Sequence, residues 1–100
     1  MPDPNAKRVL WYLFAGSRGG INRARIVDLL RDHPYNMNQL AEALSLDYKA
    51  VQHHISVLEK NNIVSKIGEK YGVLYFISNY IEANMEAFNK VRSKMKMERS

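Results

Sequence analysis

Residues 36–62 have the sequence NMNQLAEALSLDYKAVQHHISVLEKNN, which predicts two short helices separated by a tight turn. Asn36 can cap the first helix, because its side chain can accept from the backbone N–H of Gln39 while the Gln39 side chain reaches back. Asp47 is a favoured N-cap for the second helix, which is expected to cover residues 48–60. Two consecutive caps therefore place both helices and the turn between them.

The second helix has two faces of different character. Residues spaced i, i+3, i+4 and i+7 can pack against a core; they are Val51, His54, Ile55 and Leu58. The opposite face is polar and consists of Lys49, Gln52, His53 and Ser56. The first face is expected to pack, and the second is free to contact another molecule.

Two β-like runs follow the second helix. Residues 63–67 and 73–77 are rich in β-branched and aromatic side chains, and Gly68 to Gly72 has turn chemistry. Helix, turn, helix and hairpin in this order predict a winged helix-turn-helix, which places its second helix in the major groove of DNA. We therefore predict a mainly α fold with a small β-hairpin wing, as one domain over residues 1–100 (helix-turn-helix 36–60, wing 63–78, C-terminal dimerisation helix 79–97).

The flanking segments carry more apolar surface than a small core requires. Residues 6–15 predict a helix that is apolar on every side at its centre, with a buried strand as the alternative. A last helix is expected from Asn79, its N-cap, with Glu82 in the capping-box position. We expect both helices to pair two subunits rather than to pack only within their own domain, through Val9, Trp11, Tyr12, Phe14, Ile81, Met85, Phe88, Val91 and Met95.

Another helix is expected from about Asn22 to Asp32. Its apolar residues have helical spacing, and its acidic residues Asp28 and Asp32 are expected to pair with Arg25 or Arg31 on the same helix.

Composition excludes several classes of function. The 100 residues are 46 % hydrophobic and 25 % charged, which suits one domain with a core. The absence of cysteine excludes disulfides, thiolate metal sites and cysteine catalysis. No apolar run is long enough to span a membrane and no signal-peptide pattern occurs, so we expect a cytoplasmic protein. No catalytic constellation or phosphate loop is visible, so we expect neither an enzyme nor a cofactor.

The net charge of +5 is unevenly distributed. Residues 89–100 contain five basic residues and one acidic residue, so they carry +4 and the rest of the chain carries only +1. The prediction of DNA binding therefore depends on pattern rather than on total charge. The basic end is either a nucleic-acid-binding arm or the solvated end of the last helix, where positive charge suits the helix dipole.

Residues 38–64 resemble the winged helix regulators of the ArsR type. The most specific part is the pair His53 and His54, followed by an aliphatic residue, two further residues, Leu58, and a helix end before Ile63. The resemblance implies a homodimeric transcription regulator of double-stranded DNA, more often a repressor than an activator, whose flanking helices pair two subunits. Archaeal relatives share a Gly-Gly-x-x-Arg segment like residues 19–23.

The resemblance does not extend to metal sensing. Thiolate ligands are missing, and Asn38, Gln39 and Leu40 stand in the region where the family places them. His54 is expected to be partly buried and hydrogen-bonded. His53 diverges from it by about 100° on a helix, so a zinc site formed with His33 is not expected. We expect no metal, and an effector is unknown.

Candidate DNA contacts follow from the helical pattern and the resemblance. They are Tyr48, Lys49, Gln52, His53 and Ser56 on the second helix, Lys66, Lys70 and Tyr71 in the wing, and Arg18 and Arg23 on the flank, where Arg25 could also contact a phosphate. The alternatives for these positions are an ordinary solvated helix face and lysines that protect a hairpin edge. For the whole protein, the alternatives are a protein-interaction module of a transcription or repair assembly and an RNA-binding winged helix.

Overall fold

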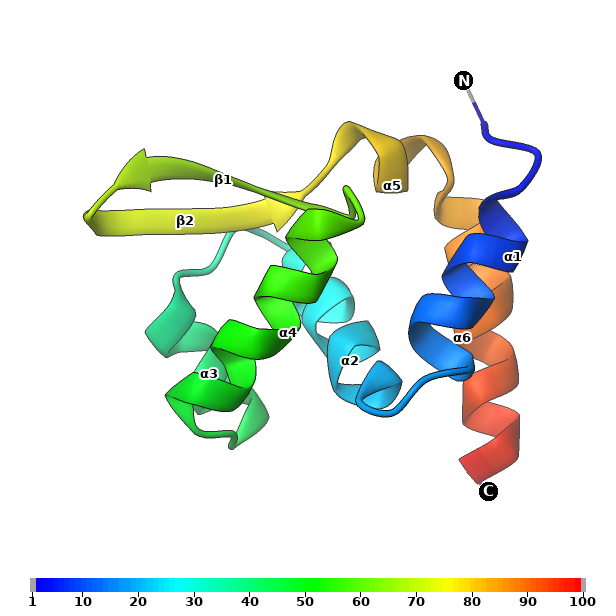
Figure 1. Ribbon diagram of the computed structural model, residues 1–100, viewed down its shortest axis with the longest axis horizontal. Helices are drawn as coiled ribbons and strands as arrows, with labels where there is room; N and C mark the ends of the chain where they lie inside the picture. The colour runs from blue at the N-terminus through cyan, green and yellow to red at the C-terminus, as the bar shows by residue number, and fades with distance from the viewer. Residues whose placement is uncertain (1, 100) are drawn as a thin grey trace.

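The computed structural model describes residues 2–99, and all of their side chains except those of Tyr71 and residues 96–99. Over this part of the chain the elements are α1 (Ala6–Leu10), the π-helix η1 (Trp11–Ala15), α2 (Gly20–Leu30), α3 (Met37–Leu44), α4 (Tyr48–Lys60), β1 (Val64–Glu69), β2 (Tyr71–Ile77), α5 (Asn79–Ala83) and α6 (Met85–Arg99) (Figure 1). The predicted fold, mainly helical with one β-hairpin, is confirmed.

The predicted caps of the helix-turn-helix are formed. Asn36 and Gln39 make the capping box, since each side chain accepts a backbone N–H of the other residue at 2.8 Å. Asp47 accepts from the backbone N–H of Ala50 at 2.7 Å, and α4 begins at the next residue. These bonds pair N–H groups that a helix start otherwise leaves free, and they fix where α3 and α4 begin.

The wing is an antiparallel hairpin whose base is attached to the helices. Lys66 pairs with Tyr75, and Ile67 pairs with Leu74, before the register shifts near the tip. Tyr35, just before α3, exchanges two backbone hydrogen bonds with Tyr75, at 3.1 and 2.8 Å. Because of this bridge, the hairpin has a fixed direction relative to α3 and α4.

One core joins the elements. From α4 it takes Val51, Ile55 and Leu58, each at most 1 % exposed, as the sequence predicts. Phe14 of η1 meets Phe88 of α6 edge-on, with ring centroids 5.3 Å apart. Burial of this apolar surface is the main favourable contribution to folding, and it attaches the N- and C-terminal helices, which lie side by side in Figure 1, to the helix-turn-helix.

The N-terminal segment is helical, so the alternative of a buried strand is wrong. Its geometry changes at Trp11, whose carbonyl accepts from the N–H of Gly16 at 2.8 Å, five residues later. The next helix also differs from its prediction, because α2 begins at Gly20 rather than at Asn22.

The C-terminal segment forms two helices instead of one, and the predicted cap is wrong. Ser78, not Asn79, caps α5 by accepting from the N–H of Ile81 at 3.2 Å. Asn84 separates α5 from α6 with a non-helical backbone, and its side-chain oxygen accepts from the N–H of Asp3 at 2.7 Å. The junction between α5 and α6 is therefore hydrogen-bonded to the N-terminal segment through Asn84 and Asp3.

Most residues expected at a dimer interface belong to the core of the single chain instead. The buried ones, all at most 4 % exposed, are Phe14, Ile81, Phe88, Val91 and Met95. The physical reason is that α6 packs along α1 and η1, so its apolar stripe is covered within the chain. Met85 is half-buried, whereas Val9, Trp11 and Tyr12 remain exposed.

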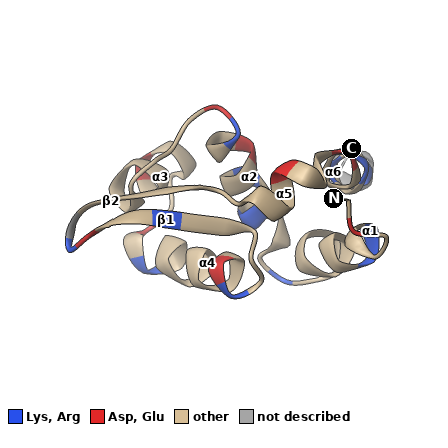
Figure 2. Ribbon diagram, turned by 90° about the horizontal axis from the view of Figure 1, so that it is seen from above, with Lys and Arg blue, Asp and Glu red and all other residues tan. Residues whose placement is uncertain are grey.

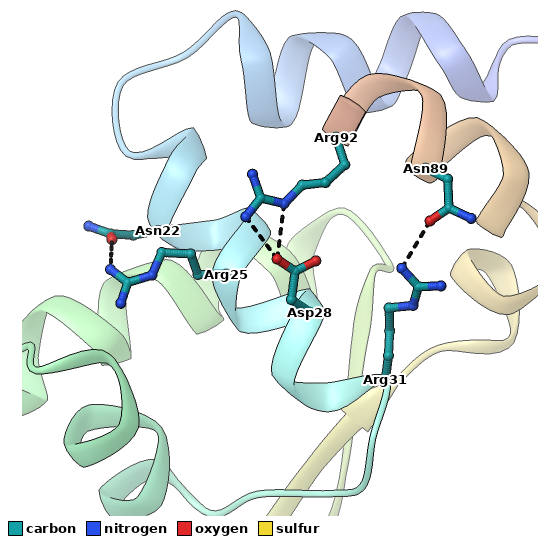
Figure 3. A network of polar contacts seen from close by, with 6 residues as sticks. All are labelled: Asn22, Arg25, Asp28, Arg31, Asn89 and Arg92. Carbon is teal, nitrogen blue, oxygen red and sulfur yellow. Dashed lines mark hydrogen bonds and ion pairs between the residues drawn. The ribbon is translucent and has the colours of Figure 1, made fainter. Parts of the chain in front are cut away.

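The acidic residue at the centre of α2 pairs across the fold rather than along its helix. Arg92 of α6 donates from Nε and Nη2 to one oxygen of Asp28, at 2.9 and 2.8 Å (Figure 3). Arg31 donates to Asn89, and Arg25 donates to Asn22. The expected pairing of Asp28 with Arg25 or Arg31 is therefore wrong, because Asp28 faces α6, where Arg92 supplies a guanidinium in suitable geometry.

Candidate nucleic-acid interface

The polar side of α4 is open to solvent. We call the exposed residues Tyr48, Lys49, Gln52, His53 and Ser56 the α4 polar face. Behind it, the buried residues of the same helix anchor it in the core. An exposed helix face that is held rigidly from behind can enter a DNA groove without rearrangement of the fold.

The wing adds basic residues beside α4. Lys66 on β1 and Lys70 at the tip are exposed, and the amino group of Lys66 lies 3.8 Å from a carboxylate oxygen of Glu59 on α4. This pair is solvated and contributes little to stability. Seen from above, basic positions lie both on the hairpin and on α4 (Figure 2). The side chain of Tyr71 lies outside the described part of the structure.

The outer face of the hairpin exposes apolar residues that the sequence analysis did not single out. Ile67 is 64 % exposed and lies opposite its partner Leu74, which is 37 % exposed. Alternation along the two strands could have revealed them, because residues with the same orientation share one face of a hairpin.

Arg23 is not a candidate for a DNA contact, contrary to the sequence-based expectation. Its side chain is only 5 % exposed, and one terminal nitrogen donates to the Ser17 hydroxyl at 2.7 Å and to the carbonyls of Arg18 and Leu13 at 3.1 and 3.3 Å. Burial lowers the pKa of Arg23. The guanidinium is thus occupied with organising the loop before α2, whereas Arg18 on that loop is exposed.

His54 connects this loop to α4. Its Nδ1 lies 3.3 Å from Nη1 of Arg23, and the ring is buried, as expected. Burial, then the charges of Arg23 and His53, lower the pKa of His54, so the ring is neutral and accepts from the arginine. His54 is therefore a structural residue on the inner side of α4.

The two glycines of the Gly-Gly-x-x-Arg segment have packing roles. A Cβ at Gly19, which has φ +82°, would lie 2.8 Å from Cε1 of His54. A Cβ at Gly20 would lie 1.7 Å from the carbonyl oxygen of Phe14. Glycine is required at both positions because the loop passes directly against η1 and α4.

In the described part of the chain, no three His, Asp or Glu residues are placed to share a metal ion. None of the helices described is long and apolar enough to cross a membrane.

The segment that contains α2, α3, α4 and the start of β1 has a family match. Residues 22–66 match the sequence model of the family described as bacterial regulatory protein, arsR family. These residues include the whole helix-turn-helix, so over this segment the chain is similar to the ArsR family. The match includes the whole α4 polar face and Lys66 of the wing. No curated protein matches the chain significantly.

Solved structures share the fold beyond this segment, because they cover nearly the whole chain. HlyU from Vibrio cholerae N16961 superposes with a TM-score of 0.65 at 22 % identity and covers 97 % of both chains. The transcriptional regulator HlyU from Vibrio vulnificus CMCP6 has a TM-score of 0.63 at 20 % identity, over 92 % of this chain and 88 % of that one. The transcriptional repressor BigR from Xylella fastidiosa has a TM-score of 0.61 at 13 % identity, over 92 % and 79 %.

At these identities the structures establish a shared fold. The ArsR family consists of DNA-binding transcription regulators rather than enzymes, so the family match and the winged helix-turn-helix together support that class for this chain.

Proposed function

We propose that the protein is a homodimeric, sequence-specific transcription repressor that binds double-stranded DNA through the α4 polar face. The observation that supports this most directly is the contrast between the two sides of α4. Its apolar residues are almost fully buried while its polar residues are exposed, although a near-neutral bundle offers little general attraction for DNA. Such a helix suits specific contact better than non-specific attachment.

The side chains of this face match the chemistry of base edges and phosphates. The amide of Gln52 can bond N6 and N7 of adenine, and Lys49 can donate to guanine or to a phosphate. Tyr48, His53 and Ser56 can donate hydrogen bonds to phosphate oxygens of the DNA backbone. Lys66 and Lys70, with Tyr71, would contact DNA from the wing, and Arg18 would contact a phosphate from the flank.

The exposed apolar residues of α1 and η1 support pairing of two chains. Val9, Trp11 and Tyr12 are 38 %, 41 % and 70 % exposed, and apolar side chains exposed together on one segment are typical of a surface that a partner covers. A two-fold axis beside these residues would place the two α4 helices of a dimer in major grooves on the same face of a duplex. The two half-sites would then lie about 34 Å apart, or a multiple of that distance.

The experiment starts with selection of bound fragments from the source genome, followed by fluorescence anisotropy on the most enriched duplex. We expect Gln52→Ala and Lys49→Ala each to weaken specific binding about tenfold, as loss of a base contact typically does. Arg31→Ala is the matched control for charge, because Arg31 is exposed but bonds to Asn89 of α6. It should leave affinity within about twofold.

Unchanged affinity in both α4 variants would refute the assignment of this face. Absence of any salt-dependent binding to duplex DNA would instead indicate a protein-interaction module. Stronger competition by structured RNA than by duplex DNA would indicate an RNA-binding winged helix.

A further inference from the structure

A cavity of about 780 Å³ lies where the end of η1, the start of α2 and the helix α6 meet. Its apolar walls come from Phe14, Ile21 and Met95, and the loop before α2 forms another side. No residue of the α4 polar face lines it. The volume is within the range of small-molecule sites.

The cavity has a strong excess of positive charge. Arg18, Arg25 and Arg92 line it, and no Asp or Glu is among its described lining residues. Asp28, just outside, pairs with Arg92, but among the described residues Arg25 bonds only to the neutral amide oxygen of Asn22, at 3.2 Å. Figure 3 shows Arg25 on α2 and Arg92 reaching toward α2 from α6. About two positive charges therefore remain without a carboxylate among the described side chains.

The backbone adds donors on the same side. The N-cap of α2 is Gly19, so no side chain caps the helix start. The N–H groups of Ile21 and Asn22, both in the lining, donate to no acceptor among the described residues, whereas those of Gly20 and Arg23 donate to carbonyls. Free N–H groups at a helix start favour an anion.

We propose that this cavity binds a small phosphorylated molecule, with its phosphate on Arg25 and on Nη1 of Arg92, which does not bond to Asp28, and its remaining part on the apolar wall. Planar guanidinium groups bind phosphate oxygens in pairs, which suits two arginines that approach from different helices. The cavity is much larger than one phosphate group, which leaves room for an organic part.

The position of the cavity also allows a bound molecule to affect α4 through the loop before α2. The lining residues Ser17 and Arg18 are the ones that Arg23 holds, and Gly19 lies directly against His54 of α4. If the proposed DNA-binding function holds, a ligand that moves this loop changes the orientation of α4 and hence the affinity for DNA. This regulatory consequence rests on that function, whereas binding to the cavity does not.

The test is isothermal titration calorimetry with inorganic pyrophosphate at low ionic strength. We expect saturable binding of one pyrophosphate per chain, weakened about tenfold by Arg25→Ala. Asn22→Asp should weaken it similarly, because it places a carboxylate beside Arg25 while an acidic residue suits the first turn of a helix. Arg31→Ala, with the same loss of charge at the C-terminal end of α2 but outside the cavity, should bind within about twofold of the unmodified protein.

Absence of saturable binding, or equal weakening by Arg31→Ala, would overturn the proposal. Circular dichroism of each variant confirms that it is folded. Arg18→Ala is not used, because the DNA-binding proposal also assigns a role to Arg18.

A second measurement separates a small phosphorylated ligand from the phosphates of DNA. Without pyrophosphate, Arg25→Ala should bind the selected duplex within about twofold of the unmodified protein. Pyrophosphate should change DNA affinity at least severalfold in the unmodified protein and not in Arg25→Ala. Loss of DNA affinity in Arg25→Ala without pyrophosphate would instead assign the cavity to the DNA backbone. Pyrophosphate binding in a protein that binds no duplex would contradict the DNA-binding function while leaving the cavity proposal intact.

Discussion

His54 is the residue at which the loop before α2 and the helix α4 depend on each other. Its pKa is lowered from 6.5 by burial, then by Arg23 and His53, so the folded protein takes up its proton less readily than the unfolded chain. The stabilisation that results from a neutral His54 is complete above the unfolded pKa of about 6.5 and is lost as the pH falls toward the folded value. Acidification therefore weakens the contact between loop and helix.

We predict that the free energy of unfolding decreases between pH 7 and pH 5, and that His54→Gln reduces this slope. Urea unfolding at several pH values measures this free energy. The two proteins are compared by its dependence on pH rather than by its absolute value, because His54→Gln also alters the contact with Arg23. His33→Gln serves as the control on the exposed surface. A slope unchanged in His54→Gln would contradict the assignment.

At the scale of elements, Ser78 connects the wing to the C-terminal helices. Its hydroxyl donates to the carbonyl of Asn62, at 2.7 Å, and accepts from the N–H of Ile81. We predict that Ser78→Ala destabilises the fold by about 1–2 kcal/mol, because one substitution removes an N-cap and a buried hydrogen bond. Asn79→Ala, the cap expected from sequence, should cost less than about 0.5 kcal/mol in the same urea titration. A larger loss in Asn79→Ala than in Ser78→Ala would contradict the observed cap.

The helix-turn-helix and the flanking regions differ in how far sequence predicts them. Caps at Asn36 and Asp47 and the buried side of α4 depend on residues within one or two turns, so spacing alone identifies them. Burial of Arg23 and the Asp28–Arg92 pair depend on residues 31 and 64 positions away, which no local pattern contains.

Likewise, an apolar stripe in the sequence does not indicate which surface packs on it. The stripe of α6 has the period of a buried face, but the period is the same whether another helix of the chain or a second subunit packs on it. The structure shows the first for Phe88, Val91 and Met95. The α4 polar face could be named from sequence, whereas the arginine-lined cavity could not, because its walls come from residues 14–25 and from residues 92–95, two segments far apart in the chain.

At the scale of the whole molecule, self-association is expected to depend on the exposed side of α1 and η1. We predict that Trp11→Glu makes the protein monomeric in sedimentation equilibrium, because a carboxylate would be buried in the interface. Leu74→Glu changes an apolar residue of similar exposure on the wing and should leave the oligomeric state unchanged. A monomeric unmodified protein, or a dimer that survives Trp11→Glu, would exclude this surface as the interface.

Loss of pairing should also reduce DNA affinity, because two linked half-site contacts bind more tightly than one.

The π turn at Trp11–Ala15 limits which insertions and deletions the N-terminal segment can tolerate. A π turn contains one residue more than an α turn, and here the surplus residue keeps Trp11 and Tyr12 outside while Leu13 and Phe14 enter the core. Excising a single position would return the segment to an uninterrupted α-helix and rotate everything before it by about 100°. The buried side chains of α1, Ala6 and Leu10, would then turn away from the core, so insertions and deletions should be far less tolerated here than in an ordinary loop.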